Sequence, residues 1–102
     1  MTFKTYIQEL PEQEDGSIQK FLEFAKNDKD LPDTSDPIKL CEYLYLKLSP
    51  ELTLAFQKMF LFFAQLEPNN DLPKMYVGNQ PLLLNVVNKI VDLQNNDPEY
   101  VF

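Results

Sequence analysis

Residues 36–66 read DPIKLCEYLYLKLSPELTLAFQKMFLFFAQL, and this stretch decides the fold. Asp36-Pro37 is a helix start signal, because aspartate caps the free N–H groups of a first turn and proline fits the first helical position. Ser49-Pro50-Glu51 repeats the same signal further along the chain. The first helix is therefore predicted to end at Leu48, and the second to begin almost at once, on a sharp corner.

The helix before the corner carries one apolar stripe. Its members recur at helical spacing and are Ile38, Cys41, Leu44, Tyr45 and Leu48. Apolar neighbours one turn away keep a thiol uncharged, and a chain without histidine has no base to pair with it. We therefore expect Cys41 to be an unreactive core residue.

The helix after the corner, residues 50–66, changes character along its length. It starts amphipathic and becomes apolar on every side at residues 60–63. Leu61, Phe62 and Phe63 point in different directions around a helix, so one small core cannot take all three. We expect the remainder to be covered by the last helix of the chain or by another chain, since monomers rarely expose large apolar patches.

Three further helices are predicted, over residues 2–10, 17–26 and 80–95, from the same apolar spacing. Thr2 is the expected N-cap of the first, and Asp15 or Ser17 that of the second. The stretches 27–36 and 68–78 are irregular. We expect Leu31 to anchor the first loop, and packing groups in the second to come from Leu72, Met75, Tyr76 and Val77.

No segment alternates for long with the period of two that is typical of a strand. The predicted fold is therefore all-α, a single compact bundle of about five short helices over residues 1–102. Residues 2–66 form its main part, and residues 67–102 add a C-terminal loop and helix.

The residue types that the chain lacks limit the reactions that it can catalyse. It has no histidine or tryptophan, and its nine basic residues are all lysine. Histidine is the side chain that titrates unaided near neutrality, and arginine is the one that clamps phosphates and carboxylates with paired bonds. We therefore predict a protein that is not an enzyme, with no catalytic residues, cofactor, metal site or small-molecule substrate.

The negative net charge limits the classes of partner that the chain can bind. A formal net charge of -7 opposes direct binding to nucleic acid or to an anionic membrane. The longest strongly apolar stretch, residues 59–64, is shorter than the roughly 20 residues that span a bilayer. The lone cysteine and the absence of an apolar run in residues 1–10 favour a cytoplasmic location.

Aspartates gather in one predicted loop, at Asp28, Asp30, Asp33 and Asp36. Calcium sites use such oxygen-rich loops. This loop, however, holds Pro32 and Asp33 where an EF-hand needs a ligand and a glycine. We interpret the aspartates as helix caps and solvated turn residues. As an alternative function, they form an acidic surface that mimics nucleic acid and occupies the basic site of a DNA- or RNA-binding protein.

Four short motifs follow one another within residues 2–66. They are Phe3-x-x-Tyr6-Ile7, Ile18-x-x-Phe21 with Ala25, Leu31-Pro32-x-Thr34-Ser35-Asp36, and Tyr43-Leu44. In this order they resemble the YozE-like family of small bacterial proteins, whose domain is described as similar to the sterile alpha motif (SAM). The resemblance implies a compact bundle of short helices in a bacterial protein, and it brings no catalytic activity with it.

These observations together predict a non-enzymatic interaction module. It binds a protein partner, or itself, through an apolar face of its fourth and fifth helices. The candidate partner-binding residues are Leu61, Phe62 and Phe63 for that face, and Asp28, Asp30 and Asp33 for the acidic alternative.

Overall fold

The computed structural model describes residues 1–66 and 71–101, and over these residues it contains helices and no strand. The elements are α1 (Phe3–Glu9), α2 (Gly16–Asn27), α3 (Pro37–Leu44), α4 (Pro50–Ala64), the 3₁₀ turn η1 (Lys74–Tyr76), α5 (Gln80–Val87) and α6 (Lys89–Asn96). The predicted all-α bundle is confirmed. Pro68, at the start of the second predicted loop, lies outside the described residues.

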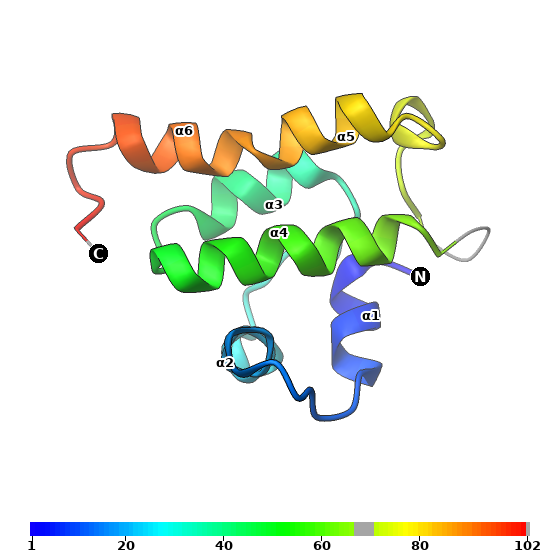
Figure 1. Ribbon diagram of the computed structural model, residues 1–102, viewed down its shortest axis with the longest axis horizontal. Coiled ribbons are helices and arrows are strands. Elements are labelled where there is room, and N and C mark those ends of the chain that lie inside the picture. The colour runs from blue at the N-terminus through cyan, green and yellow to red at the C-terminus, as the bar shows by residue number, and fades with distance from the viewer. Residues whose placement is uncertain (67–70, 102) are drawn as a thin grey trace.

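Helix α4 runs through the middle of the molecule (Figure 1). Helices α5 and α6 follow each other end to end, antiparallel to α4, and α3 packs against both of them. Helices α1 and α2 cover the other side of α4. Among the described residues, no helix has both the length and the apolar character needed to cross a bilayer.

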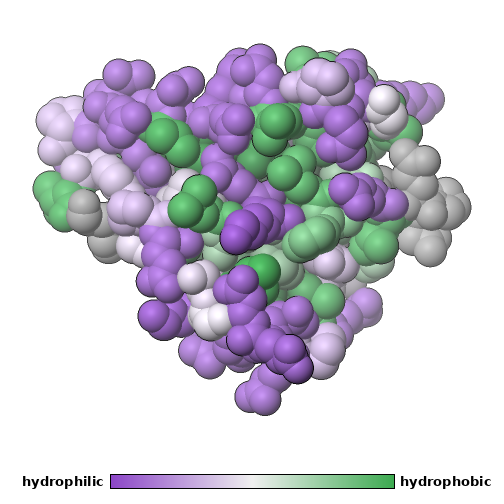
Figure 2. All heavy atoms as spheres, in the orientation of Figure 1, coloured by the Kyte–Doolittle hydropathy of each residue, from purple (hydrophilic) through white to green (hydrophobic). Residues whose placement is uncertain are grey.

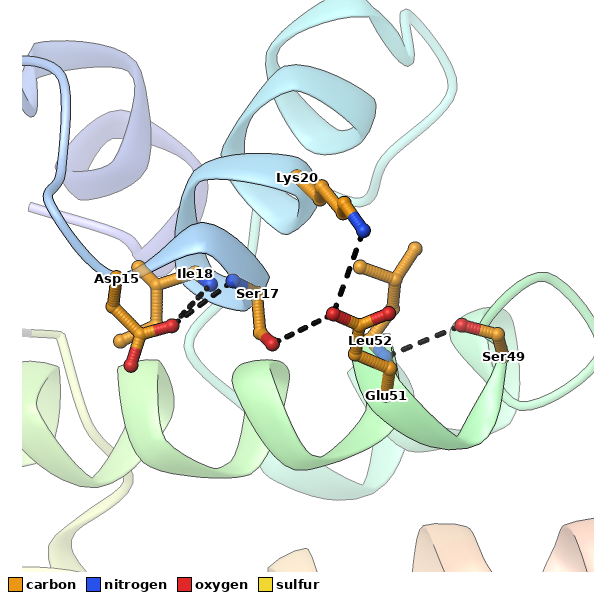
Figure 3. Close-up of polar contacts among 7 residues, drawn as sticks. All are labelled: Asp15, Ser17, Ile18, Lys20, Ser49, Glu51 and Leu52. Atoms are coloured by element: carbon orange, nitrogen blue, oxygen red, sulfur yellow. Dashed lines mark hydrogen bonds and ion pairs between the residues drawn. The ribbon is translucent and has the colours of Figure 1, made fainter.

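The helix starts are fixed by side-chain caps. Thr2, Asp15, Asp36, Ser49 and Asn79 each accept a hydrogen bond from an N–H group in the first turn of their helix. Figure 3 shows two of these caps, Asp15 on α2 and Ser49 on α4. Each such cap typically stabilises a helix by about 1 kcal/mol. The starts predicted at Asp36-Pro37 and Ser49-Pro50 are therefore confirmed.

Glu51 links the beginning of α4 to the beginning of α2 (Figure 3). Its Oε1 accepts a hydrogen bond from Ser17 Oγ at 2.8 Å and lies 3.6 Å from Lys20 Nζ. Exposed contacts of this kind contribute little energy.

The core is centred on aromatic rings. Phe3 is fully buried and its ring lies 5.3 Å from that of Phe60, 5.8 Å from Phe56 and 5.6 Å from Phe63, measured between centroids. The edge-to-face arrangement with Phe56 and Phe63 adds stabilisation beyond area burial. Leu31, the predicted loop anchor, is also buried.

Helix α3 differs from its prediction in length and in buried face. It ends at Leu44 rather than near Leu48, and residues 45–47 form a turn. Ile38 was expected in the core but is 39% exposed, whereas Leu40 is fully buried. Because α3 packs against both α5 and α6, the buried stripe is rotated toward Leu40.

The last predicted helix is divided into α5 and α6 at Asn88. The backbone of Asn88 stays in the right-handed helical region, so the two helices continue in nearly one direction. In the loop before them, Leu72 and Tyr76 are buried as predicted, but Met75 and Val77 are exposed.

Candidate protein-binding surface

Three neighbouring residues of α4 have very different environments. Phe63 is fully buried, Leu61 is half-buried and Phe62 is 55% exposed. The prediction that one core cannot take all three side chains is confirmed. The assignment of Phe63 to a surface is wrong, because its ring packs against Phe3 and Phe60.

Helix α4 packs alongside the α5–α6 pair, and we call the line of contact between them the seam. A hydrogen bond joins the two sides near the middle of this line. Gln57 Nε2 donates to Asn88 Oδ1 at 3.0 Å. Since the helices are antiparallel, residues before Gln57 lie level with residues after Asn88 (Figure 1). Leu54 and Val91 accordingly line one hollow. Leu61 comes four residues after Gln57 and Leu84 four residues before Asn88, so the antiparallel order puts both on the other side of the hydrogen bond.

We call these residues, together with Phe62, the seam face. Its members are Leu54, Gln57, Leu61, Phe62, Leu84, Asn88 and Val91. The exposed fractions of its more exposed apolar side chains are 59% for Leu54, 55% for Phe62, 47% for Leu84 and 37% for Val91. Figure 2 shows apolar side chains gathered over α4 and α5–α6, with hydrophilic ones between them. None of the seven residues is charged, but the exposed Lys58 is their neighbour on α4, one helical turn from Leu54, Leu61 and Phe62.

The hollow at one end of the seam face has a volume of about 270 Å³. Its lining is uncharged and consists of Pro50, Thr53, Leu54, Val91, Gln94, Asn95 and Tyr100. Four of these residues offer apolar or aromatic surface. The hollow can therefore accept an apolar side chain without burying a charge.

Thr53 and Gln94 are buried polar residues of this lining. Gln94 Nε2 donates to Thr53 Oγ1 at 2.7 Å, and it also lies 3.1 Å from the Tyr45 carbonyl and 3.3 Å from the Leu48 carbonyl. Tyr100 Oη donates to the same Leu48 carbonyl at 2.8 Å. The C-terminal part of the chain thus satisfies backbone groups at the corner between α3 and α4.

The aspartates of the loop before α3 have structural partners. Both Asp28 carboxylate oxygens accept from Tyr43 Oη, at 3.0 and 2.8 Å, and Asp33 accepts from Thr2 Oγ1. Asp36 caps α3, and Asp30 is exposed. Among the residues that the structure describes, no group of three or more histidine, cysteine, aspartate or glutamate side chains is placed to hold a metal ion.

A second hollow, of about 450 Å³, lies between α6 with the two residues that follow it, Asp97 and Pro98, and Tyr45, the residue after α3. Tyr45 Oη donates to Asp97 Oδ2 at 2.8 Å on its wall, and this hydrogen bond raises the pKa of the tyrosine. A tyrosine with a raised pKa is a weaker acid, so it is not prepared for proton transfer near neutral pH. The hollow presents no activated nucleophile.

Cys41 is 1% exposed, and its Sγ donates to the Val87 carbonyl across 3.7 Å. Burial raises the pKa of its thiol to about 12. The predicted place of Cys41 in the core is confirmed, and its thiol stays protonated at neutral pH.

Sequence reasoning missed Leu54, Leu84 and Val91 as surface residues. The signal that could have found them is a seven-residue spacing, which joins Leu54 to Leu61 and Leu84 to Val91.

Comparison with family models, curated proteins and solved structures finds no match to this chain. The YozE-like resemblance stays a prediction.

Proposed function

We propose that this chain is a non-enzymatic protein–protein interaction module that binds through the seam face. The observation that carries the proposal is the presence of partly exposed apolar side chains on neighbouring helices, Leu54, Leu61 and Phe62 of α4 and Leu84 and Val91 of α5–α6, with Lys58 as their charged neighbour on α4. In this chain a quarter of the residues are charged. Depletion of charge and enrichment in large apolar side chains are typical of the centre of a protein interface.

The energetics support the same conclusion. Moving one leucine, valine or phenylalanine side chain from full exposure to full burial contributes about 1.5–3 kcal/mol. The seam-face side chains are 37–59% exposed at Leu54, Phe62, Leu84 and Val91, so part of that free energy is still available to a partner. Lys58 lies among the α4 members of this face, so a partner has to leave its ammonium group in water or pair it with an acidic group.

The acidic alternative has weaker support. A mimic of nucleic acid needs carboxylates that are free to meet basic side chains. Asp28 and Asp33 instead accept hydrogen bonds from Tyr43 and Thr2 within the chain. We therefore favour the apolar face, and we place the module in the cytoplasm, where a buried unpaired Cys41 is stable.

Affinity capture from the native host tests the proposal with a matched pair of variants. Leu54→Glu places a charge on the seam face, and Met75→Glu places one at a residue of η1 that is 64% exposed. We expect Leu54→Glu to lose a captured chain that the natural sequence and Met75→Glu retain, both at low and at high salt. Equal capture by both variants would contradict the seam face. Loss in high salt alone would favour the acidic alternative.

A further inference from the structure

We infer that the bond between Asp15 and Gly16 is a site of covalent self-modification, at which isoaspartate forms when the first turn of α2 opens. The inference is independent of the seam face and goes beyond the proposed function. Of the two glycines in the chain, only Gly16 follows an aspartate. The same aspartate is the N-cap of α2, and the cap holds the reactive pair in an unreactive geometry (Figure 3).

The reaction takes place within the chain and needs only water. The Gly16 nitrogen attacks Asp15 Cγ, and a nitrogen–carbon bond forms as one carboxylate oxygen leaves. That oxygen departs as water, with the N–H proton and one proton from solvent. Water then opens the five-membered ring. Breaking the new bond restores aspartate, whereas breaking the original bond to the Asp15 carbonyl carbon leaves isoaspartate. Glycine favours the attack, because it has no side chain to shield its nitrogen.

In the closed helix the reacting atoms are held apart. Ring closure needs the Gly16 nitrogen to eclipse Asp15 Cβ across the Cα–C bond, but at the observed ψ of 118° the nitrogen is turned away from Cβ. The carboxylate faces the helix instead, and its Oδ1 accepts from Ser17 N at 2.9 Å and from Ile18 N at 3.2 Å. The Asp15 carbonyl accepts from Gln19 N at 2.9 Å, so a rotation of ψ also breaks the first hydrogen bond of α2.

The first turn of α2 is the part of this helix that opens most easily. Asp15 and Gly16 are exposed, and a Cβ built on Gly16 meets nothing within 4 Å. Ser17 Oγ donates to Glu51 on α4, but this contact is exposed and contributes little energy. The first buried side chain of the helix is Ile18. A helix end held in this way opens more often than the buried core, and water reaches the pair there.

Isoaspartate keeps the turn open once it has formed. The main chain gains one carbon at this residue, and the free carboxylate is attached directly to Cα. A carboxylate in that position no longer has the reach or the backbone geometry of an N-cap, whose side-chain oxygen must meet the N–H groups of the first turn. Modified chains therefore accumulate, and their fraction records how often α2 has opened.

Incubation of the full chain near neutral pH, folded and in guanidinium chloride, tests the inference. Isoaspartate at residue 15 is measured by peptide mapping, because it resists the protease that cleaves before aspartate, and by enzymatic methylation of isoaspartyl groups. We expect the unfolded chain to form it at least about tenfold faster than the folded chain, since only the open state reacts. Gly16→Ala should slow the reaction in guanidinium chloride, where the fold has no influence.

Two variants with the same substitution separate opening of α2 from unfolding of the whole chain. Ile18→Ala removes the first buried side chain of α2, and Ile90→Ala removes a fully buried one from α6. Circular dichroism checks that both are folded. We expect Ile18→Ala to accelerate the reaction in the folded chain more than Ile90→Ala does.

Three results would overturn the inference. The first is an equal rate in the folded and the unfolded natural chain, which would mean that the cap gives no protection. The second is the absence of isoaspartate at residue 15 even in guanidinium chloride. The third is an acceleration by Ile90→Ala that equals or exceeds that by Ile18→Ala, because the reaction would then follow global unfolding and not the opening of α2.

Discussion

Gln94 Nε2 lies 2.7 Å from Thr53 Oγ1, and both residues are buried. The contact joins α6 to the first turns of α4, next to the corner where α3 ends. Two backbone carbonyls of that corner, those of Tyr45 and Leu48, lie 3.1 and 3.3 Å from the same amide nitrogen and share its second N–H. The Gln94 side chain thus supplies N–H donors to carbonyl groups at the end of a helix, where the backbone of the sharp corner has no N–H group in place for them.

Replacing this amide should destabilise the fold. We expect Gln94→Leu to lower the free energy of unfolding by roughly 2–3 kcal/mol, because buried acceptors lose their donor. Urea denaturation measures the change, and Gln8→Leu, at an exposed position of α1, is the matched control. A double-mutant cycle with Thr53→Val should show coupling between the two sites. Equal stabilities for the Gln94 and Gln8 variants would mean that the hydrogen bonds at the corner contribute nothing.

For Ser35, another buried polar residue, we expect the opposite result: its substitution should not lower the stability of the fold. Its side chain is 3% exposed, and within the described residues its Oγ has no hydrogen-bond partner. We expect Ser35→Ala to leave stability unchanged or raise it by up to about 1 kcal/mol, since the change removes an unsatisfied buried group. Ser49→Ala removes a serine that caps α4, and it should lower stability by about 1 kcal/mol. In thermal denaturation the melting temperature should therefore fall in Ser49→Ala but not in Ser35→Ala, and a clear loss in Ser35→Ala would contradict the assignment.

The two glycines should respond differently to alanine. Gly78 has φ of 69°, and a Cβ built there meets nothing within 4 Å, so the backbone alone resists substitution. We expect Gly78→Ala to lower stability by about 1–2 kcal/mol. Gly16 begins α2 without a positive φ and also has open space, so Gly16→Ala should stabilise by up to about 1 kcal/mol. Chemical denaturation measures both, and a neutral Gly78→Ala would contradict the stated backbone conformation.

The contact between Tyr43 and Asp28 should give the chain a pH dependence in the alkaline range. Burial, together with the hydrogen bond to Asp28, raises the pKa of Tyr43 from 10.0 to about 12. A raised pKa in the folded state means that stability is present below pH 10 and lost as pH rises toward 12. The stability advantage of the natural chain over Tyr43→Phe should shrink across this interval. Denaturation at a series of pH values measures the difference, and a gap that stays constant would refute the pKa.

An independent measurement addresses the same tyrosine. Ultraviolet titration of phenolate should show one group that titrates earlier in Asp28→Asn than in the natural chain, because the carboxylate no longer opposes its ionisation. Glu14→Gln is the control, since Glu14 is an exposed carboxylate that is not among the groups that raise the pKa of Tyr43. An identical titration in both variants would show that Asp28 has no influence on Tyr43.

Local signals were sufficient to predict where the helices begin. Thr2, Asp36 and Ser49 cap first turns within their own segments, so no distant residue has to be known. The division at Asn88 was not predictable in this way, because neither glycine nor proline marks it and its side chain bonds to Gln57 on another helix.

The candidate surface depended more on tertiary packing. Sequence alone predicted that α4 has too much apolar surface for one core, but not which side chains remain outside. Phe62 and Phe63 are adjacent and chemically identical, and only the position of α1 decides that Phe63 meets Phe3. Gln94 was missed because a buried glutamine looks like any polar helix residue until its acceptors on α3 and α4 are in place.

The ring of Phe3 has a consequence for synthesis on the ribosome. Its partners Phe56, Phe60 and Phe63 lie more than fifty residues further along the chain. At about 5–20 residues per second, translation needs roughly 3–12 s between the first of these rings and the last. Until residue 63 has been synthesised, the Phe3 side chain therefore has the rings of Tyr6 and Phe21 as native neighbours but not the complete set from α4.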